Sequence, residues 1–89
     1  MIDKAGAIPN ILTRLKKTAI GSGIDLRTYK RDRSVVVMRT AADSFSVKEN
    51  GFRQESFDVD TKGLKKLLKT LLKREFPRSN KIRVYDVTE

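Results

Sequence analysis

Leucines recur at a helical spacing between residues 60 and 76, in the segment DTKGLKKLLKTLLKREF. They occupy the i, i+3, i+4, i+7 and i+8 positions of one helical face. This stripe consists of Leu64, Leu67, Leu68, Leu71 and Leu72. The pattern predicts an amphipathic helix over residues 60–76, with Asp60 or Thr61 capping its first turn and Pro77 ending it.

A second apolar stripe predicts an earlier helix over residues 9–20. It is formed by Ile8, Ile11, Leu12, Leu15 and Ala19. Pro9 suits the first turn of this helix, because its missing N–H has no partner there in any case. The glycines at positions 21 and 23 supply a stop, and residues 1–7 are expected to be a loose lead-in.

Between the two helices the apolar positions alternate, which is typical of half-buried strands. We expect strands over residues 24–30, 34–39, 44–48 and 52–59, and a last strand over residues 81–87. The continuous run from Val35 to Met38 favours a central strand that is covered, at least partly, on both faces.

Asn50-Gly51 is a strong hairpin signal between the third and fourth strands. A two-residue turn would place Phe57 and Val59 on the wrong face. A three-residue turn with a bulge at Gly51 aligns them with Phe45 and Val47, and we favour it because register follows the buried face.

The element order is therefore α-β-β-β-β-α-β in a single domain over residues 1–89. Two amphipathic helices and a mostly antiparallel sheet predict an α+β, two-layer sandwich with both helices on one face. The final strand follows a helical crossover, which allows it to lie parallel to a neighbour.

Several chemistries lack their usual residues. The chain has no cysteine and no histidine, and it contains no glycine-rich phosphate loop or nucleophile motif. Asp58 and Asp60, with Glu55 nearby, are better explained by helix capping and charge balance than by a metal. We therefore expect no enzyme activity, no cofactor, no metal and no small-molecule substrate.

The chain also lacks the marks of export or membrane insertion. Its first residues contain an acid, Asp3, and no apolar h-region. No apolar run approaches the roughly 20 residues that span a bilayer. We expect a soluble, cytoplasmic protein with no membrane partner.

The formal net charge of +9 is concentrated in one segment. Residues 61–83 hold nine basic side chains and one acid, giving +8, whereas the rest of the chain is nearly neutral. The basic side chains are Lys62, Lys65, Lys66, Lys69, Lys73, Arg74, Arg78, Lys81 and Arg83. Such asymmetry indicates an oriented electrostatic surface.

These nine residues are our predicted nucleic-acid-binding set. Lysine-rich helix faces suit phosphate contacts, so we predict a small non-enzymatic protein that binds DNA or RNA through the backbone. The alternative is a protein-interaction or homodimeric assembly module whose basic helix face is only solvated.

A second candidate surface is the sheet face away from the helices, where Arg27, Tyr29 and Tyr85 could stack on bases. The same face, with Val36 and Met38, could instead form a homodimer.

The element order is similar to that of double-stranded RNA-binding domains, which run α-β-β-β-α with lysines starting the second helix. The segment TKGLKK, residues 61–66, is loosely similar to that lysine patch. This chain departs in its additional last strand, its lack of a Gly-Pro-His-type loop and its second helix, which is not alanine-rich. The resemblance implies no residue roles here.

Overall fold

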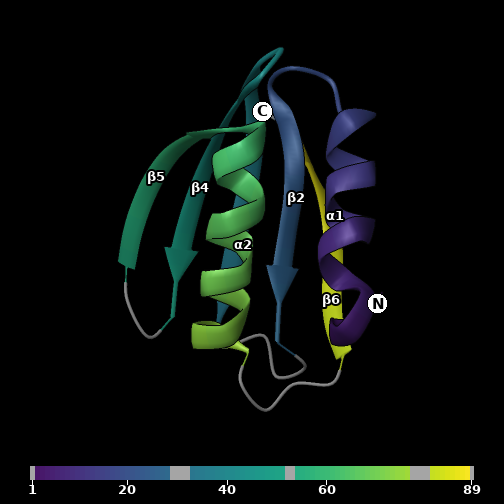
Figure 1. Ribbon diagram of the computed structural model, residues 1–89, viewed down its shortest axis with the longest axis vertical. Coiled ribbons are helices and arrows are strands. Elements are labelled where there is room, and N and C mark those ends of the chain that lie inside the picture. The colour runs from purple at the N-terminus through teal and green to yellow at the C-terminus, as the bar shows by residue number, and fades with distance from the viewer. Residues whose placement is uncertain (1, 29–32, 52–53, 77–80, 89) are drawn as a thin grey trace.

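The computed structural model describes residues 2–28, 33–51, 54–76 and 81–88. Six strands form one sheet in the order β1-β6-β2-β3-β4-β5, and every neighbouring pair is antiparallel. Two α-helices cover one face of this sheet (Figure 1). The protein thus has the expected α+β architecture and the expected order α-β-β-β-β-α-β, preceded by one short strand. The elements are β1 (Ile2–Asp3), the 3₁₀ helix η1 (Lys4–Gly6), α1 (Ala7–Lys16), β2 (Ser22–Arg27), β3 (Ser34–Ala41), β4 (Ser44–Asn50), β5 (Gln54–Asp60), α2 (Thr61–Glu75) and β6 (Lys81–Thr88).

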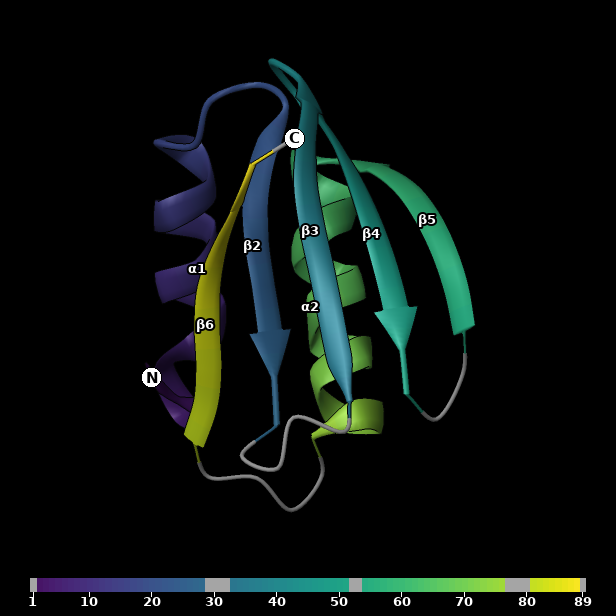
Figure 2. The same cartoon turned by 180° about the vertical axis from the view of Figure 1, so that it is seen from behind.

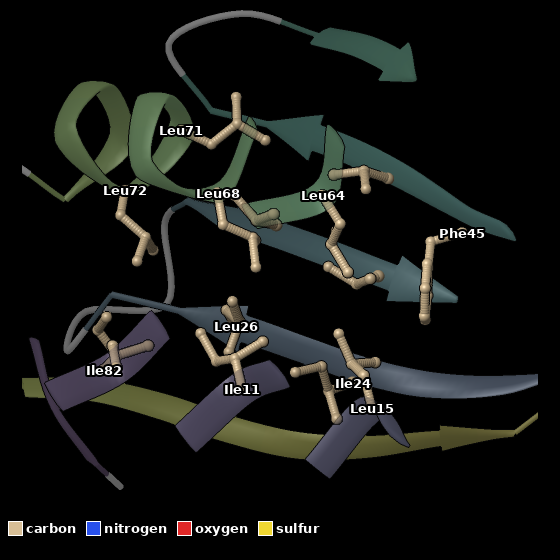
Figure 3. Packing of buried hydrophobic residues seen from close by; sticks show 14 of the residues in the cluster. Ile11, Leu15, Ile24, Leu26, Phe45, Leu64, Leu68, Leu71, Leu72 and Ile82 are labelled. Carbon is tan, nitrogen blue, oxygen red and sulfur yellow. The ribbon is translucent and has the colours of Figure 1, made fainter. Parts of the chain in front are cut away.

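The leucine-rich helix forms where its pattern predicts. Asp60 is the N-cap of α2, and its carboxylate accepts a hydrogen bond of 2.7 Å from the backbone N–H of Gly63. This bond satisfies one of the first N–H groups that have no partner inside the helix. Phe76 ends the helix and is itself completely buried. The leucine stripe therefore faces the sheet (Figure 3).

The register of the β4–β5 hairpin follows the buried face, as predicted. Phe45 lies opposite Val59, and Val47 lies opposite Phe57, so these four side chains share the face under α2. Asn50 pairs with Gln54, which leaves a three-residue connection. The shape of that turn depends on residues 52 and 53, which lie outside the described residues.

The N-terminal segment forms regular structure from Ile2 onward, so the expectation of a loose lead-in over residues 1–7 was wrong. Ile2–Asp3 pairs with β6, a 3₁₀ turn follows, and α1 begins at Ala7, whose side chain is fully buried. Pro9 is consequently the third helical residue, still among the first four whose N–H groups have no helical partner. Apolar contact by Ile2 and Ala7 with the core explains why this segment is ordered.

The first helix ends at Lys16 and not at residue 20. The guanidinium of Arg39, on β3, donates hydrogen bonds to the carbonyls of Lys16 (3.4 Å) and Thr18 (2.8 Å). These bonds satisfy carbonyls that a further helical turn would otherwise occupy. Gly21 then takes a positive φ of 91°, and its N–H donates to the carbonyl of Arg39, which turns the chain into β2.

The last strand is antiparallel to both of its neighbours, β2 and β1, which corrects the idea that it could lie parallel to one. The crossover through α2 starts at β5, at one edge of the sheet, and enters β6 near the other edge. There β6 meets β2, which runs in the opposite direction (Figure 2).

One hydrophobic cluster lies between the helices and the sheet. Leu64, Leu68, Leu71, Ile11, Leu15, Leu26 and Val37 are buried in it, and Leu12 and Leu67 pack against it. On β3, however, Val36 and Met38 are only half-buried. They point to the face without helices, so this central strand is fully covered on one side only (Figure 2).

Truncating Leu68 to Ala should lower the free energy of unfolding by about 2–5 kcal/mol, because the side chain is fully buried and leaves a cavity. Chemical denaturation measures the loss. The neighbouring exposed Lys69→Ala is the control and should change stability by less than about 0.5 kcal/mol. A loss for Leu68→Ala as small as that of the control would contradict its place in the core.

Gly23→Ala should also destabilise the fold, by about 1–3 kcal/mol or more. A Cβ at this position would lie 1.9 Å from the backbone carbonyl oxygen of Val37, which a strand cannot move without distorting the sheet. Gly6→Ala is the matched control, since a Cβ there meets nothing within 4 Å. Gly6 is the N-cap of α1, so its substitution should cost no more than about 1 kcal/mol. Equal losses in thermal unfolding would refute the steric explanation.

Candidate nucleic-acid interface

The outer face of α2 carries five exposed lysines. They are Lys62, Lys65, Lys66, Lys69 and Lys73. Because the leucine stripe fixes the rotation of the helix on the sheet, these side chains must project away from it. Within the described part of the chain, none of the five forms an ion pair. They are therefore available to an external anion.

The first helix extends this basic surface. Arg14, Lys16 and Lys17 are exposed at the C-terminal end of α1, on the same side of the sheet as α2 (Figure 1). Helix α1 contains no acidic residue, and the one acid in α2, Glu75, is 1% exposed. The two helices and Lys17, the C-cap of α1, thus present eight exposed cations, and the exposed acid at the helix ends is Asp60, the N-cap of α2. We call this surface of eight cations the helical basic layer.

Arg74, a member of the predicted nucleic-acid-binding set, is only partly exposed and is paired with an acidic side chain. Its Nε and Nη2 donate hydrogen bonds of 2.8 and 2.6 Å to the two carboxylate oxygens of Glu49, whose side chain is fully buried. These bonds raise the pKa of Arg74 above its ordinary value. The pair ties the end of α2 to β4, and a buried carboxylate without it would be costly.

Two further members of the predicted set lie on the opposite side of the sheet. Ile82 faces the helices, so its neighbours Lys81 and Arg83 on β6 face away from them. Lys81 pairs with Asp3 of β1, and Arg83 lies directly across from Arg27 of β2. The basic residues of β6 therefore do not join the helical basic layer. Arg78 lies outside the described residues.

The predicted second surface, on the open face of the sheet, is partly formed. The Arg27 guanidinium lies 5.9 Å from the centre of the Tyr85 ring, and its Nε donates to Asp25 Oδ2 at 2.9 Å. Arg83 joins this group through its register with Arg27. Arg27 is thus already engaged by a carboxylate and a ring, which leaves less of its charge for a ligand. Tyr29 lies outside the described residues.

The acidic residues serve capping and internal pairing. Asp60 caps α2 as predicted, and Glu49 pairs with Arg74 inside the fold. Over residues 2–28, 33–51, 54–76 and 81–88, no group of three acidic side chains is placed to hold a metal ion.

Sequence reasoning missed two contributions to this region. The predicted first helix includes Arg14, Lys16 and Lys17, but these residues were not part of the predicted binding set. The absence of acidic residues from that helix indicated that it too carries a basic surface. Arg39 gave no such signal, because its bonds to the end of α1 depend on how β3 meets the helix in space.

Comparison with known proteins adds no assignment: neither a protein-family model, nor a curated protein, nor a solved structure matches this chain. In the described part of the chain, no helix combines the length and the apolar composition needed to cross a bilayer.

Arg74→Met should lower the thermal unfolding midpoint markedly, because it leaves the buried Glu49 carboxylate without its cation. Lys69→Met, which removes an exposed and unpaired charge from the same helix, is the control and should change the midpoint little. If Arg74→Met is as stable as Lys69→Met, the Glu49 pair does not stabilise the fold. The double variant Glu49→Gln with Arg74→Met should recover part of the loss, since the buried Glu49 charge is removed together with its Arg74 partner.

Proposed function

We propose that this protein is a small, non-enzymatic nucleic-acid-binding protein that contacts phosphates through the helical basic layer. One observation carries the proposal: eight exposed cations on α1, its C-cap and α2 share one side of the molecule, and the one acid within these two helices, Glu75, is buried. A solvated face kept for solubility would tolerate both signs of charge. A surface of one sign attracts a polyanion and releases its counterions on binding.

The geometry of α2 suits a phosphate backbone. Lys62 and Lys73 are separated by about 16 Å along the helix axis, at roughly 1.5 Å per residue, which is enough to follow several phosphates. Lysine is a flexible point charge that contacts phosphates without fixed bidentate geometry. The layer therefore supports binding without sequence preference, to DNA or RNA, and the cytoplasm is the compartment in which we expect it.

Binding should weaken steeply with salt. On duplex DNA we expect a log–log slope near −0.9 per phosphate, with about three to five phosphates contacted. Changing Lys66 and Lys69 together to Ala should flatten the slope by about two contacts and reduce affinity equally for unrelated sequences. Fluorescence anisotropy with two unrelated 20-base-pair duplexes, each measured over a series of salt concentrations, gives both quantities.

The matched control removes two lysines from the other side of the sheet. Lys48 and Lys81 are exposed there, so the double change to Ala lowers the net charge equally without touching the helical basic layer. It should leave the slope almost unchanged. Equal effects of the two double variants would mean that only net charge matters, and loss of binding to one duplex alone would mean that the lysines read sequence. Both outcomes would refute the proposal, as would a wild type that binds neither duplex at low salt.

A second candidate function rests on the open face of the sheet. Over the residues that the structure describes, no helix covers this face (Figure 2). The half-buried Val36 and Met38 lie on it together with Tyr85, which is 39% exposed. Apolar side chains left on a sheet face favour association with a second copy of the chain. Sedimentation at low and high salt separates the two functions. A dimer insensitive to salt, with no binding of nucleic acid, supports the assembly module.

A further inference from the structure

A groove of about 320 Å³ opens between the C-terminal end of α1 and the N-terminal end of α2. The turn between β3 and β4 closes it from the side of the sheet. Its volume falls at the lower end of the range of about 300–1,000 Å³ that small-molecule sites occupy. The groove therefore has the size of a ligand site and not of a packing defect.

The inner surface of the groove is mostly apolar. Its apolar lining residues are Leu12, Leu15, Ala42, Phe45 and Leu64, and Thr61 adds one hydroxyl. Three of these, Leu15, Phe45 and Leu64, belong to the hydrophobic core, and Figure 3 shows them toward one end of it. Their positions are set by core packing, so the groove is formed before any ligand arrives.

The rim of the groove is basic. Lys16, Arg39, Lys62 and Lys65 all line it, and among the described residues no acid does. The two acids nearest in sequence accept hydrogen bonds from neutral donors: Asp43 from the Thr61 hydroxyl, and Asp60 from the N–H of Gly63. These bonds leave both carboxylate charges in place, but the four cations of the rim outnumber them. The groove consequently combines mostly apolar walls with a net positive rim.

This combination defines the chemistry of a fitting ligand. Arg39 donates to the carbonyls of Thr18 and Ala42, so the three lysines are the rim groups free to meet an anion. The rim thus offers hydrogen-bond donors, whereas the walls are apolar apart from the Thr61 hydroxyl, which already donates to Asp43. A nucleobase carries its own donors, which would remain unpaired against leucine side chains. An unbranched hydrocarbon with a terminal anion leaves no such group unpaired.

We propose that this groove binds a single acyl chain through its apolar walls, with the carboxylate head held by Lys16, Lys62 and Lys65. The occupant is thus a fatty-acid-like monoanion. Apolar burial supplies the affinity, and the lysines fix which end of the chain points outward. The site does not depend on nucleic-acid binding, although it shares Lys16, Lys62 and Lys65 with the helical basic layer.

Decanoate, used below its micelle-forming concentration, is the probe. In a methyl NMR titration of the full chain, decanoate should shift the signals of Leu12, Leu15 and Leu64 in a saturable way. Acetate, which has the head group alone, and decyltrimethylammonium, which has a similar chain and the opposite charge, should not. Changing Lys62 and Lys65 together to Ala should weaken decanoate binding by about tenfold.

Ala42→Phe tests the location, since Ala42 is exposed, lines the groove and can be enlarged without altering charge. It should abolish decanoate binding and leave the salt-dependent binding of duplex DNA in place. Ala41→Phe, at an exposed position that does not line the groove, is the matched control and should retain decanoate. Unchanged thermal unfolding verifies that both variants fold.

Three results would overturn the proposal: no saturable shift with decanoate, equal shifts with decyltrimethylammonium, or equal effects of the two Phe variants. Loss of duplex binding with decanoate binding intact would refute only the nucleic-acid function, and the reverse result would refute only the groove.

Discussion

Burial of the α2 leucine stripe against the apolar face of the sheet is the constraint on which the rest of the structure depends. The stripe can bury its leucines in one rotation only, and that rotation turns every α2 lysine toward solvent. The same apolar face sets the β4–β5 register, since Phe57 and Val59 must lie under α2. Hydrophobic burial therefore decides both where the chain packs and where its charge is displayed.

Several arginines and the α2 lysines have different positions in the fold. Three arginines make contacts within the fold: Arg74 pairs with Glu49, Arg39 caps the end of α1, and Arg27 pairs with Asp25. A planar guanidinium forms several directed hydrogen bonds at once, which suits such junctions. The α2 lysines remain on the surface, where a mobile ammonium group suits a phosphate or a carboxylate. Some cations of this protein therefore stabilise the fold, and others are exposed and available to a ligand.

The helical basic layer and the groove meet at the N-terminal end of α2. Lys62 and Lys65 belong to both, so an anion seated in the groove would neutralise part of the surface that we propose for phosphates. Occupancy of one site should therefore weaken the other, because the two ligands compete for the same cations and repel each other. Such a coupling needs no conformational change.

The sequence by itself determined helix α2, the existence of α1 and of strands β2 to β6, the α+β class, the hairpin register and the exposure of the α2 lysines. All of these follow from local periodicity and from which side chains avoid water, and both can be read along the chain. Only the tertiary structure decided that β6 inserts between β1 and β2, that Arg39 ends α1 at Lys16, and that Arg74 faces inward to Glu49. The tertiary structure also places Lys81 and Arg83 on the sheet face away from the helices, although they belong to the same basic segment as the α2 lysines. These outcomes depend on contacts between residues distant in sequence, where the partner of a charge is set by sheet order and not by its neighbours along the chain.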